Sequence, residues 1–270
     1  MKSLFDLFLF STNPREIREA VAAGVEGVVV DWEQLGKADR QHHADTEINR
    51  HTVEDLRIAR ASTRATVVCR INPVGVTTKR EIEDAIAAGA DEILLPMVRS
   101  VKEVSAAVGM ARERCGVGIL VETVEAVESA GELARLPLSR VYVGLNDLMI
   151  DRGHTNIFTA VLDGTIERIR SNFAVPFGFG GLTLVERGFP VPCRLLIAEM
   201  ARLDCRFSFL RRSFHRDMAG HRPSDEIPRI LEAITIATRR RSDDVVRDRF
   251  ELTDTINRML FERPARLEIA

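Results

Sequence analysis

The feature that most constrains the fold of this chain is a regular alternation of two sequence patterns. Short runs rich in Val, Ile, Leu and Phe predict strands at residues 4–10, 27–32, 65–71, 92–98, 118–122, 141–145, 175–180 and 206–210. Runs such as GVVV, EILLPMV and GILV are almost continuously apolar, which is typical of parallel strands buried on both faces. The segments between them carry apolar residues at spacings of three and four and predict helices. This alternation favours a parallel sheet built from βαβ units.

Eight strand–helix units in succession predict an α/β fold, a single (β/α)8 TIM barrel with an additional C-terminal helix. Such barrels reach roughly 250 residues as one domain, and no Pro-, Gly- or Ser-rich linker divides the 270 residues of this chain. We therefore expect a barrel catalytic domain over residues 1–242. A charged amphipathic pattern runs from Asp243 to Arg263. We assign residues 243–270 to a helical extension that caps the barrel or contacts another subunit.

Composition limits the partners and the location of the protein. The 38 basic and 40 acidic residues give a net charge of -2, so we expect neither nucleic acid nor a membrane as partner. No apolar run approaches the roughly 18 residues of a membrane span, and Asp6 interrupts the first run, which we interpret as a strand rather than a signal peptide. The four cysteines occur singly, as reduced thiols do. We therefore expect a cytoplasmic protein.

Polar side chains follow the predicted strands at their carboxyl ends, where barrel enzymes place their active sites. Four of these groups are carboxylates and several are arginines, so opposite charges are expected to converge at one mouth. The residues are Asp31 and Glu33 after the second strand, Arg70 after the third, Glu122 after the fifth, Asn146 and Asp147 after the sixth, and Arg211, Arg212 and His215 after the eighth.

Glu122 and Asp147 are the candidate metal ligands. A carboxylate that ends an apolar strand is costly to desolvate unless a positive charge meets it. For either residue alone, an ion pair with one of the many arginines is the alternative explanation. Two carboxylates at the same predicted mouth favour a shared divalent cation. A ligand set of oxygens suits Mg²⁺ or Mn²⁺ better than zinc.

Arg70 follows the apolar run ATVVC, which places its guanidinium at the mouth. The functional interpretation is a bidentate grip on a carboxylate or an enolate oxygen. The alternative is an ion pair with Glu33 or Glu122. Of Asp31 and Glu33, one is expected to support the site rather than to contact the substrate. Their order in the sequence leaves open which one does so.

The scarcity of lysine excludes one class of chemistry. The chain has only Lys2, Lys37, Lys79 and Lys102, and none of them lies in a predicted barrel strand. A Schiff-base aldolase needs a lysine that projects into the barrel, so neither a Schiff base nor pyridoxal phosphate is expected. If the barrel makes or breaks carbon–carbon bonds, a metal ion has to accept the developing charge.

The chain resembles a known family over roughly residues 4–218, and five motifs carry the resemblance. The resemblance is to the HpcH/HpaI aldolase and citrate lyase beta-subunit family, part of the pyruvate and phosphoenolpyruvate barrel superfamily. It rests on AAGVEGVVVDWE, VVCRIN, AAGADEILLPMV, GILVET and VYVGLNDL, in the family's order and spacing.

The resemblance implies a role for most of the residues at the mouth. Glu122 and Asp147 would bind Mg²⁺ or Mn²⁺, Arg70 would steady the keto or enolate oxygen, and the backbone around Asn146 and Asp147 would receive the substrate carboxylate. It also implies pyruvate-like or acyl-CoA substrates, and a homo-oligomer that exchanges helices near its carboxyl end.

Two departures from the family pattern concern proton transfer. Glu33 is followed by Gln34, where pyruvate aldolases of the family typically have histidine and citrate lyases have Asp-Ala. Leu120 stands where the family commonly has glutamine. Because glutamine cannot exchange a proton near neutral pH, another group has to do so. Metal-bound water is the favoured candidate, and His215 or His154 is the alternative.

These observations favour a metal-dependent carbon–carbon lyase of the aldolase type, acting through a metal-bound enolate of a pyruvate-like 2-oxo acid. Its catalytic residues would come from Arg70, Glu33, Asp31 and His215, and its substrate-binding residues from Arg70, Asn146, Asp147 and Arg211. One alternative is an acyl-CoA lyase of the citrate lyase type, with Arg211 and Arg212 binding the CoA phosphates. The other is a catalytically silent barrel that binds a metabolite, which the missing histidine favours and the retained Glu122, Asp147 and Arg70 disfavour.

Overall fold

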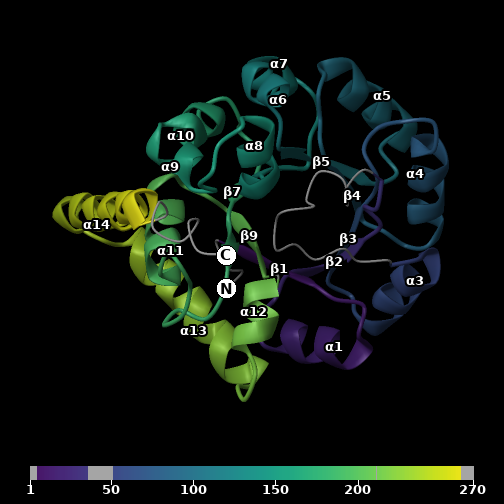
Figure 1. The fold of residues 1–270 in the computed structure, drawn as a ribbon. Coiled ribbons are helices and arrows are strands. Elements are labelled where there is room, and N and C mark those ends of the chain that lie inside the picture. The colour runs from purple at the N-terminus through teal and green to yellow at the C-terminus, as the bar shows by residue number, and fades with distance from the viewer. Residues whose placement is uncertain (1–4, 36–50, 211, 263–270) are drawn as a thin grey trace, which may run out of the picture.

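A computed structural model of the chain describes residues 5–35, 51–210 and 212–262 and has the predicted barrel architecture (Figure 1). Parallel strands surround the centre and helices form a ring outside them. The strands are β1 (Asp6–Phe10), β2 (Gly27–Asp31), β3 (Thr66–Arg70), β4 (Glu92–Leu95), β5 (Gly116–Val121), β6 (Arg140–Val143), β7 (Phe177–Phe179), β8 (Gly181–Leu182) and β9 (Phe207–Leu210).

The helices of the described residues separate these strands and extend beyond the last of them. They are α1 (Pro14–Ala22), α3 (Val53–Ser62), α4 (Thr78–Ala87), α5 (Val101–Ala111), α6 (Val124–Glu128), α7 (Ala130–Leu133), α8 (Leu145–Asp151), α9 (Thr159–Leu162), α10 (Thr165–Arg170), α11 (Cys193–Arg202), α12 (Arg212–Asp217), α13 (Pro223–Thr238) and α14 (Ser242–Glu262). The start of α1 has a clear local cause. Asn13 caps α1 by accepting hydrogen bonds from the N–H groups of Arg15 and Glu16.

The seventh strand of the barrel is divided in two at Gly180. This glycine has a φ of +57°, a conformation that interrupts the strand. β7 pairs with β6 on one side, and β8 pairs with β9 on the other. The Oγ of Ser208 donates to the Gly180 carbonyl at 2.6 Å across this break. The described segments β1 to β9 therefore occupy eight positions around the barrel, and the predicted (β/α)8 fold is confirmed.

The barrel interior is filled by inward-facing side chains rather than left open. Phe8, Phe10, Val29, Val68, Leu94, Leu120, Tyr142, Phe207 and Phe209 form this inner cluster. The Phe8 and Phe207 rings meet edge to face, with their centroids 6.0 Å apart. At the amino ends of the strands, the buried Arg140 Nε donates to Glu92 at 2.6 Å. The carboxyl ends are therefore the end of the barrel at which a site can open.

Two predicted strand ends are wrong, and each has a physical reason. The fourth strand ends at Leu95 rather than Val98, because Pro96 has no N–H to continue the ladder. The sixth strand ends at Val143 rather than Leu145, and α8 begins at Leu145. Asn146 and Asp147 therefore lie in the first turn of a helix instead of at the end of a strand. Gly144, just before this helix, leaves room for the Glu122 side chain, since a Cβ there would lie 2.2 Å from Glu122 Oε1.

The C-terminal helix packs against the barrel and begins one residue before the predicted start. α14 lies beside α11 at the outer edge of the ring (Figure 1). It buries Leu252 and Ile256, and Arg249 Nη1 donates to the buried Glu199 of α11 at 2.5 Å. Arg263, the last residue of the predicted helix, lies outside the described residues. No helix within the described ranges combines the length and the apolar character needed to span a bilayer.

Replacing Ile256 with alanine tests whether α14 is an integral part of the fold. The Ile256 side chain is 0% exposed, so Ile256→Ala should lower the free energy of unfolding by about 2–5 kcal/mol through lost burial and a residual cavity. Urea unfolding measures this change. The fully exposed Val76 is the matched control, and Val76→Ala should change the free energy by less than about 0.5 kcal/mol. Equal effects of the two variants would contradict the described packing of α14.

Candidate active site

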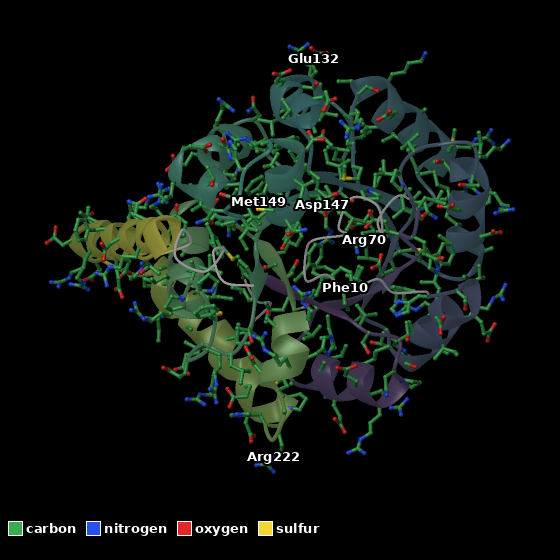
Figure 2. All side chains as sticks on the ribbon, in the orientation of Figure 1. Phe10, Arg70, Glu132, Asp147, Met149 and Arg222 are labelled. Atoms are coloured by element: carbon green, nitrogen blue, oxygen red, sulfur yellow. The ribbon has the colours of Figure 1, made fainter. Side chains whose placement is uncertain are left out.

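A cavity of about 440 Å³ opens at the carboxyl ends of the strands. Its polar lining includes Arg70, Glu122, Asn146 and Asp147. Figure 2 shows Phe10, Arg70 and Asp147 near the centre of the helical ring, whereas Glu132 and Arg222 lie at its edge. The cavity therefore brings these four residues, which the sequence assigns to metal or substrate binding, together at the predicted mouth.

The floor of the cavity is apolar and largely aromatic. It consists of inward-facing side chains from four different strands, namely Phe10, Leu120, Tyr142 and Phe209. The guanidinium carbon of Arg70 lies 5.4 Å from the centroid of the Phe10 ring, an attractive cation–π contact. An apolar floor excludes water and lowers the local dielectric constant, which strengthens the electrostatic interactions above it.

Arg70 is held in place by two carboxylates of the neighbouring strand. In the parallel register of β2 and β3, Asp31 and Arg70 are direct partners. Arg70 Nε donates to Asp31 Oδ1 at 2.8 Å, and Nη2 donates to Oδ2 at 2.6 Å. Arg70 Nη1 lies 3.2 Å from Glu33 Oε2. Burial lowers the pKa of Arg70, but the charges of Asp31 and Glu33 outweigh that effect and the net change is upward, so the guanidinium stays charged.

The contacts of Arg70 distinguish the roles of Asp31 and Glu33, which the sequence leaves open. Asp31 is 0% exposed and takes both parallel hydrogen bonds, the strongest geometry available to a guanidinium and a carboxylate. Its Oδ1 also accepts from the Glu33 N–H at 3.2 Å. Asp31 therefore fixes the orientation of Arg70, and Glu33 adds a further ion pair. The predicted ion pair with Glu33 and the predicted place of Arg70 at the mouth both occur.

Glu122 is a buried carboxylate without a cation in direct contact among the described residues. Its Oε2 accepts a hydrogen bond from the Met97 N–H at 3.0 Å. Met97 itself has a φ of +51°, which is uncommon for a residue other than glycine. Burial, together with the negative charges of Asp147 and Glu33, raises the pKa of Glu122 to about 8. The metal-free site therefore favours a proton on this carboxylate near neutral pH.

The first turn of α8 contributes Asn146 and Asp147 to the same cavity. Within the described chain, the buried Nδ2 of Asn146 has no hydrogen-bond partner, and a buried amide donor of this kind is costly unless a ligand or water accepts from it. The first N–H groups of a helix also lack intrahelical acceptors. This side of the cavity therefore offers donors, whereas Glu122 and Asp147 offer acceptors.

These residues fit a divalent cation. Arg70 pairs with Asp31 and Glu33, whereas the buried Glu122 accepts from the Met97 N–H and faces the negative charges of Asp147 and Glu33. Among the described residues, no group of three or more His, Cys, Asp or Glu side chains is arranged as a metal site. Glu122 and Asp147 would therefore be two ligands of an ion completed by substrate and water, as Mg²⁺ prefers.

The two histidines considered for proton transfer do not line the cavity in the described structure. His215 Nδ1 lies 2.9 Å from Glu16 Oε1, and Nε2 lies 2.9 Å from the Phe10 carbonyl oxygen. These contacts tie α12 to β1 and α1. Burial raises the pKa of Glu16, but hydrogen bonds from His215 and Ser11 outweigh it and the net change is downward. His154 follows the carboxyl end of α8.

Of the two arginines predicted after the eighth strand, the structure describes Arg212. Arg212 lies at the start of α12 and lines the cavity. Arg211, the predicted substrate-binding residue, lies outside the described residues.

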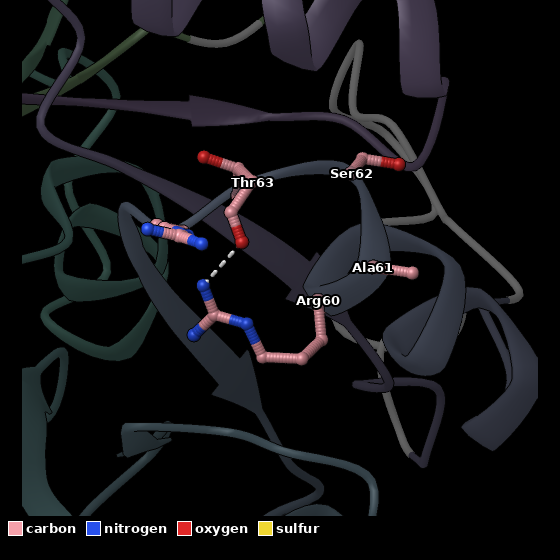
Figure 3. Close-up of a pocket in the computed structure, with 5 residues that line it drawn as sticks. Arg60, Ala61, Ser62 and Thr63 are labelled. Atoms are coloured by element: carbon pink, nitrogen blue, oxygen red, sulfur yellow. Dashed lines mark hydrogen bonds between the residues drawn. The ribbon is translucent and has the colours of Figure 1, made fainter.

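Another hollow lies at the opposite end of the barrel and lacks comparable chemistry. It is lined by residues 60–64, at the carboxyl end of α3. Figure 3 shows the Arg60 guanidinium donating to the Thr63 carbonyl. Arg60 also donates to the Ala65 carbonyl and to Asp91. Its guanidinium is thus engaged with the protein itself, and the carboxyl-end cavity is the candidate active site.

Several residues of this cavity were not predicted from the sequence. Ile157, Phe158, Phe189 and Val191 line it from loops. No strand or helix periodicity marks such loop positions, so only the folded chain brings them to the mouth. Leu120, which departs from the family pattern, is a floor residue of the cavity. It lies two residues before Glu122, so the two side chains face the same side of the extended chain.

The fold and this site define an α/β barrel in which a buried arginine pairs with two buried carboxylates at the carboxyl ends of the strands. Residues 4–171 match the sequence profile of the HpcH/HpaI aldolase/citrate lyase family, and the chain belongs to that family. The family comprises lyases of the aldolase and citrate lyase kinds.

Solved structures resemble the whole chain in fold. The crystal structure of citrate synthase SbnG has 20% sequence identity and a TM-score of 0.54, covering 90% of this chain and 95% of that chain. The crystal structure of RipC from Yersinia pestis has 14% identity and a TM-score of 0.55, covering 89% of this chain and 98% of that chain. At these identities the similarity establishes the fold. A search of curated protein sequences gave no match.

The raised pKa of Glu122 predicts how the stability of the metal-free protein depends on pH. The folded value of about 8 exceeds the ordinary value of 4.5, so between these pH values the folded chain holds a proton that the unfolded chain has lost. Stability should therefore fall as pH rises through this range. In the presence of a chelator, Glu122→Gln should be more stable than the original chain at pH 8 by at least about 1.4 kcal/mol, the equivalent of one pKa unit. Urea unfolding at pH 5 should show little gain. A difference that does not change with pH would refute the assignment.

Proposed function

We propose that this protein is a metal-dependent carbon–carbon lyase of the aldolase type. It forms or cleaves the bond between C3 of a pyruvate-like 2-oxo acid, the carbon next to the keto group, and a partner carbon, through the enolate of the 2-oxo acid. The observation that carries the proposal is the buried cluster of carboxylates around Arg70, at the mouth of a barrel of this lyase family. An enolate needs compensation for a new negative charge, and a cation beside Glu122 would provide it while relieving the repulsion of this carboxylate by Asp147 and Glu33.

Glu122 and Asp147 would hold Mg²⁺ or Mn²⁺. Burial and the negative charges of Asp147 and Glu33 raise the pKa of Glu122. This supports the assignment, because a dication would relieve the repulsion among these carboxylates. When bound, the cation would act as a Lewis acid that orients the 2-oxo acid and stabilises the charge of its enolate. Gly144 contributes by leaving room for the Glu122 side chain.

Arg70 would donate to the oxygen on which the enolate charge develops. A guanidinium has five N–H donors, and the described contacts with Asp31 and Glu33 use three of them. The others can serve a ligand in the cavity that Arg70 lines. Because Asp31 fixes the guanidinium beforehand, no reorganisation is needed as charge develops, which is the basis of electrostatic stabilisation in active sites.

The carboxylate of the 2-oxo acid would be received by the first turn of α8. The unsatisfied Nδ2 of Asn146 and the first N–H groups of the helix are donors suited to a carboxylate. Arg212 and Arg216 line the outer part of the cavity, and their positive charge favours the entry of an anion. The same two arginines are the observation that keeps acyl-CoA, which carries phosphates, as a second candidate substrate.

The proton of the partner's hydroxyl group would be exchanged with water in the cavity. His215 is engaged by Glu16 and Phe10 away from the lining, so its proposed role changes from acid or base to positioning. By holding α12 against β1, it supports the helix from which Arg212 and Arg216 extend.

The C-terminal helix α14, which extends the barrel domain, would mediate contact between the subunits of a homo-oligomer. α14 buries Leu252 against the barrel while Val246 and Phe250 remain exposed on its other side. Apolar side chains exposed together on one helix are typical of an interaction surface.

Replacing Arg70 with lysine tests the enolate assignment. Lysine keeps the charge but loses the planar fork, so Arg70→Lys should lower kcat by about 10²–10³, the usual effect of losing a preorganised oxyanion donor. The measurement is exchange of the pyruvate methyl protons with D₂O by the Mn²⁺-loaded protein. Arg114→Lys is the control, since Arg114 pairs with Glu83 on the surface. An unchanged exchange rate in a folded Arg70→Lys protein would make Arg70 structural.

Replacing Asp147 with asparagine tests the metal assignment without relying on activity. Asp147→Asn removes one of two anionic ligands and should weaken Mn²⁺ binding at least about tenfold. Titration calorimetry, or the electron paramagnetic resonance signal of free Mn²⁺, measures the affinity. Asp163→Asn is the control, because Asp163 pairs with Arg152 outside the cavity. If both variants bind Mn²⁺ as the original chain does, Asp147 is not a ligand.

A further inference from the structure

The cavity has a second half that the proposed chemistry does not use. Beyond the charged residues, its wall is built of apolar side chains from α8, α11 and the loops beside them: Leu145, Ile157, Phe158, Phe189, Val191 and Leu196. The whole volume of about 440 Å³ falls in the range of roughly 300–1,000 Å³ in which proteins enclose complete ligands. A three-carbon 2-oxo acid beside Arg70 leaves this half vacant for a second molecule.

The polar groups within this wall are already paired with one another. Thr183 Oγ1 donates to Asp217 Oδ2 at 2.7 Å, and the buried Cys193 Sγ donates to the Thr183 carbonyl at 3.1 Å. Cys193 Sγ also accepts from the Thr183 N–H at 3.4 Å. At the opening, Arg216 Nε donates to Asp217 Oδ1 at 3.0 Å. The wall therefore meets a bound molecule chiefly through carbon.

Phe189 extends this apolar wall to the rim of the cavity. It is 92% exposed and lies in the loop between β8 and α11, whereas Val191 and Phe158 beside the same cavity are buried. A single exposed apolar residue is ordinary, but one that continues a buried apolar wall at a cavity mouth is typical of a ligand contact.

The loop that carries Phe189 is shaped by its own backbone. Gly188 has a φ of +106°, and a Cβ there would lie 2.6 Å from the Cys193 nitrogen. The Cys193 N–H donates to the Arg187 carbonyl at 2.8 Å, and the Arg187 N–H donates to the Leu184 carbonyl at 2.9 Å. These constraints place the Phe189 backbone beside the cavity without help from a ligand, so the ring is available to one.

We infer that this apolar half binds the carbonyl partner of the reaction, that the partner is an aldehyde with an apolar aliphatic or aromatic substituent, and that Phe189 is a specificity-determining residue. The inference rests on the proposed function. In the synthetic direction, C3 of the 2-oxo acid enolate forms a bond to the aldehyde carbon. The carbonyl π bond breaks, its oxygen takes a proton from water, and the product is a 4-hydroxy-2-oxo acid. Cleavage is the reverse.

The test compares aldehydes of similar size with the full-length, Mn²⁺-loaded protein and pyruvate. We expect kcat/KM for 3-methylbutanal and benzaldehyde to exceed that for 4-oxobutanoate, which carries a carboxylate, by at least about tenfold, the selectivity that a group of this size commonly gives in an apolar pocket. Phe189→Ser should reduce this ratio several-fold, mainly through KM for the apolar aldehydes. Val76→Ser, at a fully exposed position outside the cavity lining, should leave the ratio unchanged.

Exchange of the pyruvate methyl protons involves no aldehyde and reports the proposed function separately. Absence of exchange in the original chain would refute the proposed function. Exchange together with a preference for 4-oxobutanoate would overturn only the inference and would assign the partner site to Arg212 and Arg216. Turnover of an acyl-CoA in place of aldehydes would also overturn it. So would an equal effect of Phe189→Ser on charged and apolar aldehydes.

Discussion

The site depends on one buried guanidinium, that of Arg70, which two buried carboxylates hold in place. Asp31 and Arg70 are direct partners in the parallel register of β2 and β3, so the pairing of two barrel strands creates the ion pair. Asp31 and Glu33 hold the guanidinium in one orientation. Breaking a buried pair of this kind commonly costs about 3–5 kcal/mol, so Arg70 is as important for the integrity of the mouth as for the proposed chemistry.

Two further features of the cavity are the raised pKa of Glu122 and the position of α8. Burial of Glu122, together with the negative charges of Asp147 and Glu33, raises the pKa of Glu122 to about 8. The early start of α8 at Leu145 places Asp147 and the amide of Asn146 at the cavity. A site with this balance of charge is suited to a cation and an anionic substrate bound together, which is what the stabilisation of an enolate requires.

Sequence patterns predict the barrel and the polar mouth because both follow from periodicity. Arg70 and Glu122 end or follow apolar strands, and parallel strands bring such ends to one edge. The loop residue Phe189 and the contacts of His215 with Glu16 and Phe10 depend on tertiary packing, to which no local pattern corresponds. The start of α8 does not follow from the sequence either, because Val141 to Leu145 continues the apolar pattern. The close approach of Glu122 to Gly144, where a Cβ would lie 2.2 Å from Glu122 Oε1, exists only in the folded chain.

A crystal structure of the protein with Mn²⁺ and oxalate, an analogue of the pyruvate enolate, tests the central claim most directly. Anomalous scattering locates the Mn²⁺ ion independently of activity. The claim predicts one ion in contact with both Glu122 and Asp147, and an oxalate oxygen within hydrogen-bonding distance of Arg70. An ion bound elsewhere, or oxalate that does not approach Arg70, would contradict it.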